Sequence, residues 1–68
     1  MLNFRKIRLL RDQAGLSVTE LADKVYVNYT MISKIEAGVK APSVELLKRI
    51  ADCLSVTVDE LLLEAETS

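Results

Sequence analysis

The stretch SVTELADKVYVNYTMISKIE, residues 17–36, contains two short helical patterns separated by a few residues. Ser17 and Glu20 have the spacing of a capping box, in which each side chain accepts a hydrogen bond from the other residue's backbone amide. Asn28 is of a type that caps the start of a second helix. We therefore predict two short helices joined by a turn of about three to four residues.

The apolar residues of this stretch indicate how the two helices pack. Ala22 is small enough to allow a close crossing, and Val27 follows in the turn. Ile32 and Ile35 then recur on one face of the second helix. The pattern is that of a helix-turn-helix unit, whose second helix enters the major groove of DNA.

The other face of the second helix carries hydrogen-bonding and cationic side chains. They are Asn28, Tyr29, Thr30, Ser33 and Lys34. Side chains of these types, near the start of such a helix, can contact base edges in the major groove. We therefore predict that this face binds DNA.

Helix punctuation continues on both sides of this unit. Asn3 can cap a first helix that ends at Gly15, Ser43 can cap a fourth, and Thr57 can cap a short fifth. The fourth helix is expected to bury an apolar stripe of Val44, Leu47, Ile50, Ala51 and Leu54. We predict an all-α, compact bundle of about five short helices, with the helix-turn-helix as helices 2 and 3, forming one domain over residues 1–68.

The composition fits a small aliphatic core. Half of the 68 residues are apolar and only 4% are aromatic, which is too apolar for a disordered chain. Apolar runs such as residues 61–63 are far too short to span a membrane, and Arg5, Lys6 and Arg8 interrupt any signal peptide. We expect a cytoplasmic, nucleoid-associated protein with no membrane partner.

The charges are distributed unevenly along the chain, although the net charge is only −1. All nine basic residues lie between Arg5 and Arg49, together with five acids, so this part carries +4. Residues 50–68 contain five acids and no base, including an acidic tail from about residue 64. The first two-thirds of the chain can therefore attract phosphate. Lys48 and Arg49 are interpreted as generic surface charge.

The sequence offers no catalytic or metal-binding constellation. It contains no histidine, no paired nucleophile and base, and no glycine-rich phosphate loop. Cys53 stands alone among apolar residues and is interpreted as a small core residue. We expect no enzymatic activity, no cofactor, no metal and no small-molecule ligand.

Motifs that match one known family occur in order from about residue 4 to residue 62. They are Ile7-Arg8, Leu10-Arg11, Gly15-Leu16-Ser17, Glu20-Leu21-Ala22, Val27, residues 32–38, Pro42-Ser43, Leu46-Leu47 and residues 59–62. In these motifs the chain resembles the lambda-repressor-like DNA-binding domains, which include phage repressors, Cro proteins and the Xre regulators. The resemblance implies a sequence-specific transcriptional regulator.

The resemblance also implies roles for individual residues. Asn28, Tyr29, Thr30, Ser33 and Lys34 match positions that contact base edges and flanking phosphates in relatives. The backbone amides of Val18 and Thr19 match a phosphate site at the start of the second helix. Lys40 matches a loop that lies on the sugar-phosphate backbone. Arg11 and Glu36 match an internal ion pair, which makes them structural.

Three positions depart from the family pattern. Val18 replaces a common glutamine, so the backbone donor remains but the side-chain donor is lost. Tyr26 replaces the usual glycine of the turn, and Ser55 replaces a common glycine after the fourth helix. A left-handed Tyr26 would cost about 1–2 kcal/mol, unless packing of its ring offsets this cost or the turn has another conformation.

We expect the protein to bind a two-fold operator in double-stranded DNA as a homodimer and to act as a repressor rather than an activator. Leu9, Leu62 and Leu63 are candidates for the dimer interface. The alternative is a protein–protein interaction module of the same fold with weak or no DNA binding. Val18, Tyr26 and the acidic last third favour that alternative, and a salt-dependent binding titration distinguishes the two.

Overall fold

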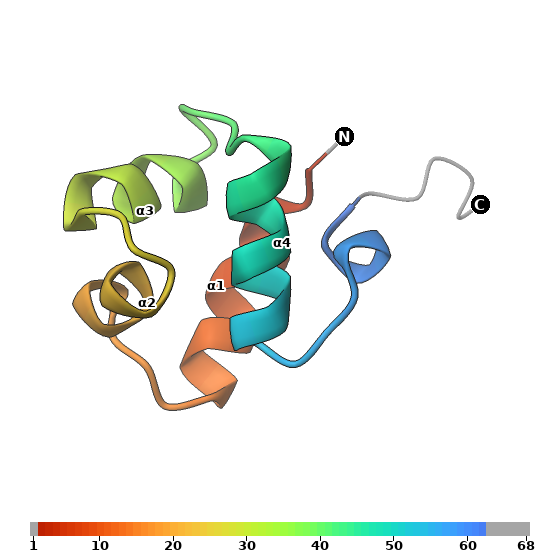
Figure 1. The fold of residues 1–68 in the computed structure, drawn as a ribbon, viewed down its shortest axis with the longest axis horizontal. Helices are drawn as coiled ribbons and strands as arrows, with labels where there is room; N and C mark the ends of the chain where they lie inside the picture. The colour runs from red at the N-terminus through yellow and green to blue at the C-terminus, as the bar shows by residue number, and fades with distance from the viewer. Residues whose placement is uncertain (1, 63–68) are drawn as a thin grey trace.

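The computed structural model describes residues 2–62, which form four α-helices and one 3-10 helix. The α-helices are α1 (Phe4–Gln13), α2 (Val18–Lys24), α3 (Tyr29–Glu36) and α4 (Val44–Cys53), and the 3-10 helix is η1 (Val58–Leu61) (Figure 1). Within these residues, β-type pairing is limited to one antiparallel bridge between Leu2 and Leu62. The expected all-α bundle is confirmed, and its last short helix is wound as a 3-10 helix.

Each helix begins at the cap that its sequence predicts. Asn3, Ser17, Asn28, Ser43 and Thr57 each accept a hydrogen bond from a backbone amide three residues later, at 2.9 to 3.3 Å. At α2 the capping box is complete, because the amide of Ser17 also donates to the Glu20 carboxylate at 2.8 Å. These bonds satisfy amides that have no partner inside the helix, which is why the helices start at these residues.

Four residues in the turns have left-handed backbone conformations. Gly15 and Gly38 have φ angles of 75° and 78°, which glycine adopts without steric cost. Tyr26 and Ser55 have φ angles of 64° and 61°, although both carry a Cβ. The turn between α2 and α3 therefore keeps its left-handed residue despite the tyrosine, at a backbone cost of about 1–2 kcal/mol.

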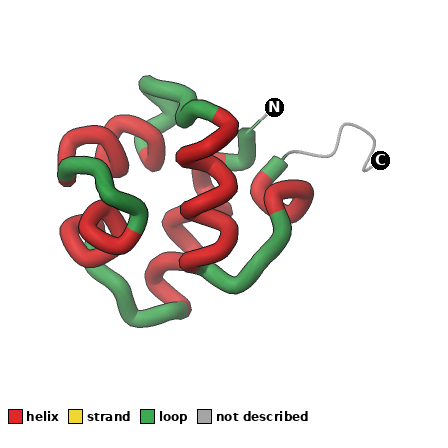
Figure 2. The backbone as a smooth tube through the Cα atoms, in the orientation of Figure 1, coloured by secondary structure: helices red, strands yellow, loops and turns green. Residues whose placement is uncertain are grey.

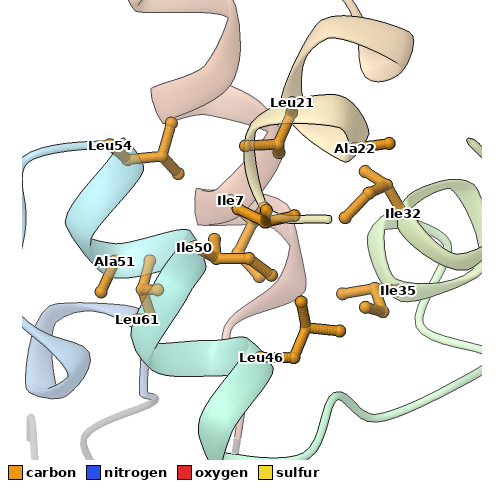
Figure 3. Close-up of a cluster of buried hydrophobic side chains, with 11 residues drawn as sticks. Ile7, Leu21, Ala22, Ile32, Ile35, Leu46, Ile50, Ala51, Leu54 and Leu61 are labelled. Atoms are coloured by element: carbon orange, nitrogen blue, oxygen red, sulfur yellow. The ribbon is translucent and has the colours of Figure 1, made fainter. Parts of the chain in front are cut away.

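One aliphatic core joins all five helices. Seven large side chains are less than 2% exposed: Ile7, Leu21, Val25, Ile32, Ile35, Ile50 and Leu61. Figure 3 shows Ile7 in the middle of this cluster, with Ile32 and Ile35 reaching it from α3 and Ile50 from α4. Burial of such side chains contributes about 1.5–3 kcal/mol each, which is the main source of stability in a chain with few aromatic residues.

The register of α4 differs from the prediction at its first residue. Val44 was expected in the buried stripe, but it is 73% exposed. Ile50 and Ala51 are buried as predicted, whereas Leu46, which the stripe left out, is buried and Leu47 is only half-buried. Val44 lies in the first turn, beyond the edge of the face that α2 and η1 cover. Cys53 is half-buried and packs against the core, as its interpretation as a core residue requires.

The helices are arranged so that α2 and α3 lie together at one end of the molecule (Figure 2). α1 and α4 lie in the middle of the view, and η1 lies at the opposite end, where Leu2 pairs with Leu62 directly after η1. Because α2 and α3 lie at one end of the molecule, one side of α3 is left uncovered.

None of the helices in residues 2–62 has the length and apolar character that a membrane span requires.

Candidate nucleic-acid interface

The uncovered side of α3 and the loop after it form a shallow groove. The groove has a volume of about 200 Å³ and is lined by Asn28, Thr30, Met31, Lys34 and Lys40. Four of these five residues, all except Met31, are predicted from the sequence to contact DNA. Two lysines and no carboxylate line the groove, so its charge suits an anion such as a backbone phosphate.

Asn28 has a structural role as well as an exposed position. Its Oδ1 accepts a hydrogen bond from the Met31 amide at 2.9 Å and caps α3. This bond fixes the orientation of the side chain and leaves the amide nitrogen as its free donor. Asn28 can therefore donate to a phosphate or a base edge, but a bidentate contact with adenine would need the capping oxygen as well.

The remaining predicted residues of α3 differ in how far they reach into solvent. Tyr29 is 54% exposed, and Thr30 and Lys34 are exposed as well. Ser33 is half-buried, one helical turn after Thr30. A ligand that lies along α3 would meet Thr30 and Lys34 first, and Ser33 only if it approached closely.

The start of α2 presents backbone amides rather than side chains. The capping box uses the amides of Ser17 and Glu20, and within residues 2–62 it leaves those of Val18 and Thr19 without a hydrogen-bond partner. The Val18 side chain is half-buried against the core, whereas Thr19 is exposed. The side-chain donor lost at Val18 is therefore replaced by an apolar contact that holds the start of the helix.

Lys40 is held close to α3 by the backbone of its loop. The amides of Val39 and Lys40 both donate to the Lys34 carbonyl, at 2.9 and 3.3 Å, after Gly38 turns the chain in a left-handed conformation. The Phe4 ring lies against Gly38, and a Cβ at that position would be only 2.9 Å from the ring. Lys40 and Lys34 can therefore act on the same ligand.

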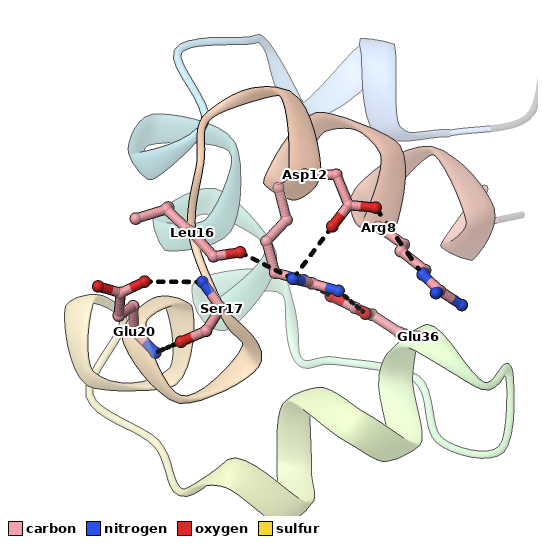
Figure 4. Close-up of polar contacts among 7 residues, drawn as sticks. Arg8, Asp12, Leu16, Ser17, Glu20 and Glu36 are labelled. Atoms are coloured by element: carbon pink, nitrogen blue, oxygen red, sulfur yellow. Dashed lines mark hydrogen bonds and ion pairs between the residues drawn. The ribbon is translucent and has the colours of Figure 1, made fainter.

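Arg11 and Glu36 form an ion pair inside the molecule (Figure 4). The guanidinium donates to both Glu36 oxygens, at 2.7 and 3.1 Å, and to the Leu16 carbonyl at 2.8 Å. Both side chains are only 9% exposed. The hydrogen bonds to Glu36 raise the pKa of Arg11 despite its burial, so the charge is retained. The pair links α1 to the end of α3 and leaves neither group free for a ligand.

The three candidates for a dimer interface have different surroundings. Leu9 is 54% exposed on α1. Leu62 is half-buried and bridges Leu2. Leu63 and the acidic tail from residue 64 lie outside the described residues.

Met31 also lines the groove, although its sequence position predicts a core residue. Its place among the apolar residues of α3 favoured burial, and it is in fact half-buried between the core and the groove. The signal that could have identified it is its spacing, since Met31 lies one helical turn before Lys34.

Comparison with known proteins agrees with this geometry. The sequence model of the Helix-turn-helix family matches residues 7–61. The chain is 46% identical over 57 residues to the transcriptional activator BcrR of Enterococcus faecalis and 44% identical over 64 residues to the transcriptional regulator SlrR of Bacillus subtilis. These matches cover 84% and 93% of the chain, but only 28% and 41% of the two relatives.

Solved structures show the same fold. The P22 c2 repressor, solved in complex with a synthetic operator, matches with a TM-score of 0.86 and 27% identity over 91% of the chain and 94% of its own. The biofilm regulator SinR, solved in complex with DNA, matches with a TM-score of 0.82 and 31% identity over 88% of the chain and 97% of its own. The chain therefore belongs to the lambda-repressor-like, or Xre-type, helix-turn-helix family of transcriptional regulators, which are not enzymes.

Proposed function

We propose that the chain binds double-stranded DNA as a homodimer on a two-fold operator, with α3 in the major groove, and acts as a repressor. Thr30 and Ser33 contact base edges, and the Asn28 amide and Tyr29 contact bases or the phosphates beside them. Lys34 and Lys40 neutralise phosphates, and the amides of Val18 and Thr19 bind another phosphate at the start of α2. A protein bound in this way is associated with the nucleoid.

The observation that carries this proposal is the groove beside α3. It brings Lys40, from the loop, next to Asn28, Thr30 and Lys34 of the predicted recognition helix. Base-reading groups and phosphate-binding cations must lie side by side for a helix to sit in a groove between two phosphate backbones. Thr30, Lys34 and Lys40 are exposed, so their side chains have no role in packing the core.

The relatives support the choice of ligand. The c2 repressor and SinR were both solved with DNA, and both share this fold over most of the chain. The Val18 substitution is compatible with the same contact, because the donor at that site is the backbone amide. The net charge of −1 is compatible as well, since all nine bases lie within residues 5–49.

The proposal of a dimer rests on how little DNA one recognition helix can read. One recognition helix reads only a few base pairs, and two copies must be about 34 Å apart to enter successive major grooves on one side of the duplex. We assign the contact between copies to Leu9 and Leu62, and Leu63, which lies outside the described residues, remains a candidate from the sequence. Leu62 directly follows η1, which lies at the end of the molecule opposite α2 and α3 (Figure 2).

Repression requires the fewest additional contacts. A protein that occupies an operator excludes other proteins from it, whereas activation needs a further surface that binds the transcription machinery. Because the chain spans less than half the length of BcrR and SlrR, their effects on transcription are not carried over to it.

The experiment is selection of bound sequences from a random duplex pool, followed by titration of the best duplex at two salt concentrations. We expect two inverted half-sites separated by about one helical turn, and an affinity that falls steeply with salt. A single half-site at saturation would contradict the dimer. Failure to retain any duplex at low ionic strength would overturn DNA binding and favour the interaction module.

A further inference from the structure

The turn between α2 and α3 has an unusual composition for its conformation. Tyr26 is left-handed, with a φ of 64°, and its side chain is 81% exposed, so burial of the ring does not compensate for the backbone conformation. Backbone bonds within the turn run from Tyr26 to the Asp23 carbonyl at 3.3 Å and from Val27 to the Ala22 carbonyl at 3.0 Å. These two bonds close the turn, and the exposed ring is open to a further contact from a neighbouring helix.

Arg49 of α4 supplies that contact. Its guanidinium carbon lies 5.8 Å from the centroid of the Tyr26 ring, within the range of a cation–π interaction. Its Nη1 also lies 3.5 Å from the carbonyl of Val25, the residue before Tyr26. The interpretation of Arg49 as generic surface charge is therefore wrong, because two consecutive residues of the turn contact it.

Glu45 holds Arg49 in the required orientation. It lies one helical turn earlier on α4 and accepts a hydrogen bond from Nη2 at 2.9 Å. The guanidinium is planar, so it can pair with a carboxylate along one edge and still present its face to an aromatic ring. A lysine has a single ammonium group and cannot make both contacts in this geometry.

We propose that Arg49 is a positioning residue for DNA binding, which acts by holding Tyr26 and thereby setting the direction of α3. This inference rests on the proposed function. Arg49 lines none of the groove beside α3, whose residues are Asn28, Thr30, Met31, Lys34 and Lys40. Its effect must therefore pass through the turn, since Val27 and the cap of α3 follow Tyr26 directly. Tyr26 and Arg49 form one unit that replaces the glycine common at this turn.

Four proteins test this unit: the wild type, Arg49→Met, Tyr26→Gly and the double variant. The readouts are affinity for the selected duplex and hydrogen exchange of the Tyr26 and Val27 amides, both measured well below the melting temperature. In the wild-type background, Arg49→Met should weaken binding about two- to fivefold and speed exchange by a similar factor. In the Tyr26→Gly background, the same substitution should have a much smaller effect on both.

Lys48→Met provides the matched control, because Lys48 is an exposed cation next to Arg49 on the same helix. It removes the same charge without removing the contacts to the turn. Equal loss of affinity in Lys48→Met and Arg49→Met would overturn the proposal in favour of general electrostatic attraction. Additive effects in the double variant would also overturn it, since they would show that Arg49 does not act through Tyr26.

The exchange measurement separates this proposal from the function on which it rests. If the wild type binds no duplex, the proposed function fails, and amide exchange still decides whether Arg49 holds the turn. Unchanged exchange at Tyr26 and Val27 in Arg49→Met would overturn that hold. Faster exchange at these two amides, with unchanged exchange in the core of α1, would support it.

Discussion

The two sides of α3 use polar residues in opposite ways. At its inner end Glu36 pairs with Arg11 and both side chains are 9% exposed, so every strong contact is made within the molecule. On the outer side Thr30, Lys34 and Lys40 line an open groove. The comparison shows that charge in this small domain has two separate purposes. The buried pair fixes the position of the helix, and the exposed groups remain available for a ligand.

The largest expected effect is on the buried side. Arg11→Ala leaves the Glu36 carboxylate and the Leu16 carbonyl without their donor, and should lower the free energy of unfolding by about 3 kcal/mol. Thermal and urea unfolding measure this loss. Arg8→Ala is the matched control, because the Arg8–Asp12 pair is 4.0 Å long with side chains 70% and 58% exposed. It should cost less than about 1 kcal/mol. Equal melting of Arg11→Ala and wild type would contradict a structural role for the pair.

The next largest effect is expected at Gly38, in the loop that connects the inner end of α3 to Lys40 of the groove. Gly38→Ala forces an alanine to a φ of 78° and places its Cβ 2.9 Å from the Phe4 ring. Gly15→Ala imposes a similar φ of 75° with no atom within 4 Å, so it isolates the backbone cost of about 1–2 kcal/mol. We expect Gly38→Ala to cost about 1 kcal/mol more in urea unfolding, because the ring must move. Identical losses would show that the Phe4 contact does not support the loop.

A smaller effect, on binding alone, is expected on the outer side. Thr30→Ala and Ser33→Ala each remove one hydroxyl and should lower affinity for the selected duplex by about 1 kcal/mol. Affinity for duplexes altered at the contacted base pair should not change. Repeating the selection with each variant gives the altered preference, and melting temperatures should match the wild type. An unchanged preference in both variants would exclude these hydroxyls from base recognition.

The smallest effect should come from Lys40. Lys40→Ala should weaken binding to all duplexes alike and reduce the slope of log affinity against log salt by about one, as loss of one phosphate contact requires. Lys48→Ala on α4 is the control, because this exposed lysine is not among the residues of the groove and should leave the slope unchanged. A changed sequence preference with an unchanged slope would place Lys40 at a base instead.

Much of the fold could be predicted because its signals are local. The caps at Asn3, Ser17, Asn28, Ser43 and Thr57 act on amides three residues away, so the helix starts follow from short segments of sequence. Errors arose where burial depends on distant elements. Val44 fits the periodicity of α4 but lies outside the covered face, and Arg49 resembles any surface cation until the turn at Tyr26 is placed beside it.

The candidate site divides in the same way. The polar residues of α3 could be named from their spacing on one helix. The position of Lys40 beside Lys34 depends on the left-handed turn at Gly38 and on the Phe4 ring from the other end of the chain. The half-buried position of Met31 depends on where the core ends.

The sequence by itself determined where the helices start, most of the residues that form the aliphatic core and which face of α3 is polar. These properties depend on hydrogen bonds and side-chain periodicity over a few residues. Tertiary structure alone decided that Arg49 supports the α2–α3 turn and that Lys40 joins the groove of α3. Arg49 and Tyr26 are 23 positions apart in the chain and meet only where α4 packs beside the turn. Lys40 is brought back to Lys34 by the left-handed turn at Gly38, against which the Phe4 ring from the start of the chain packs.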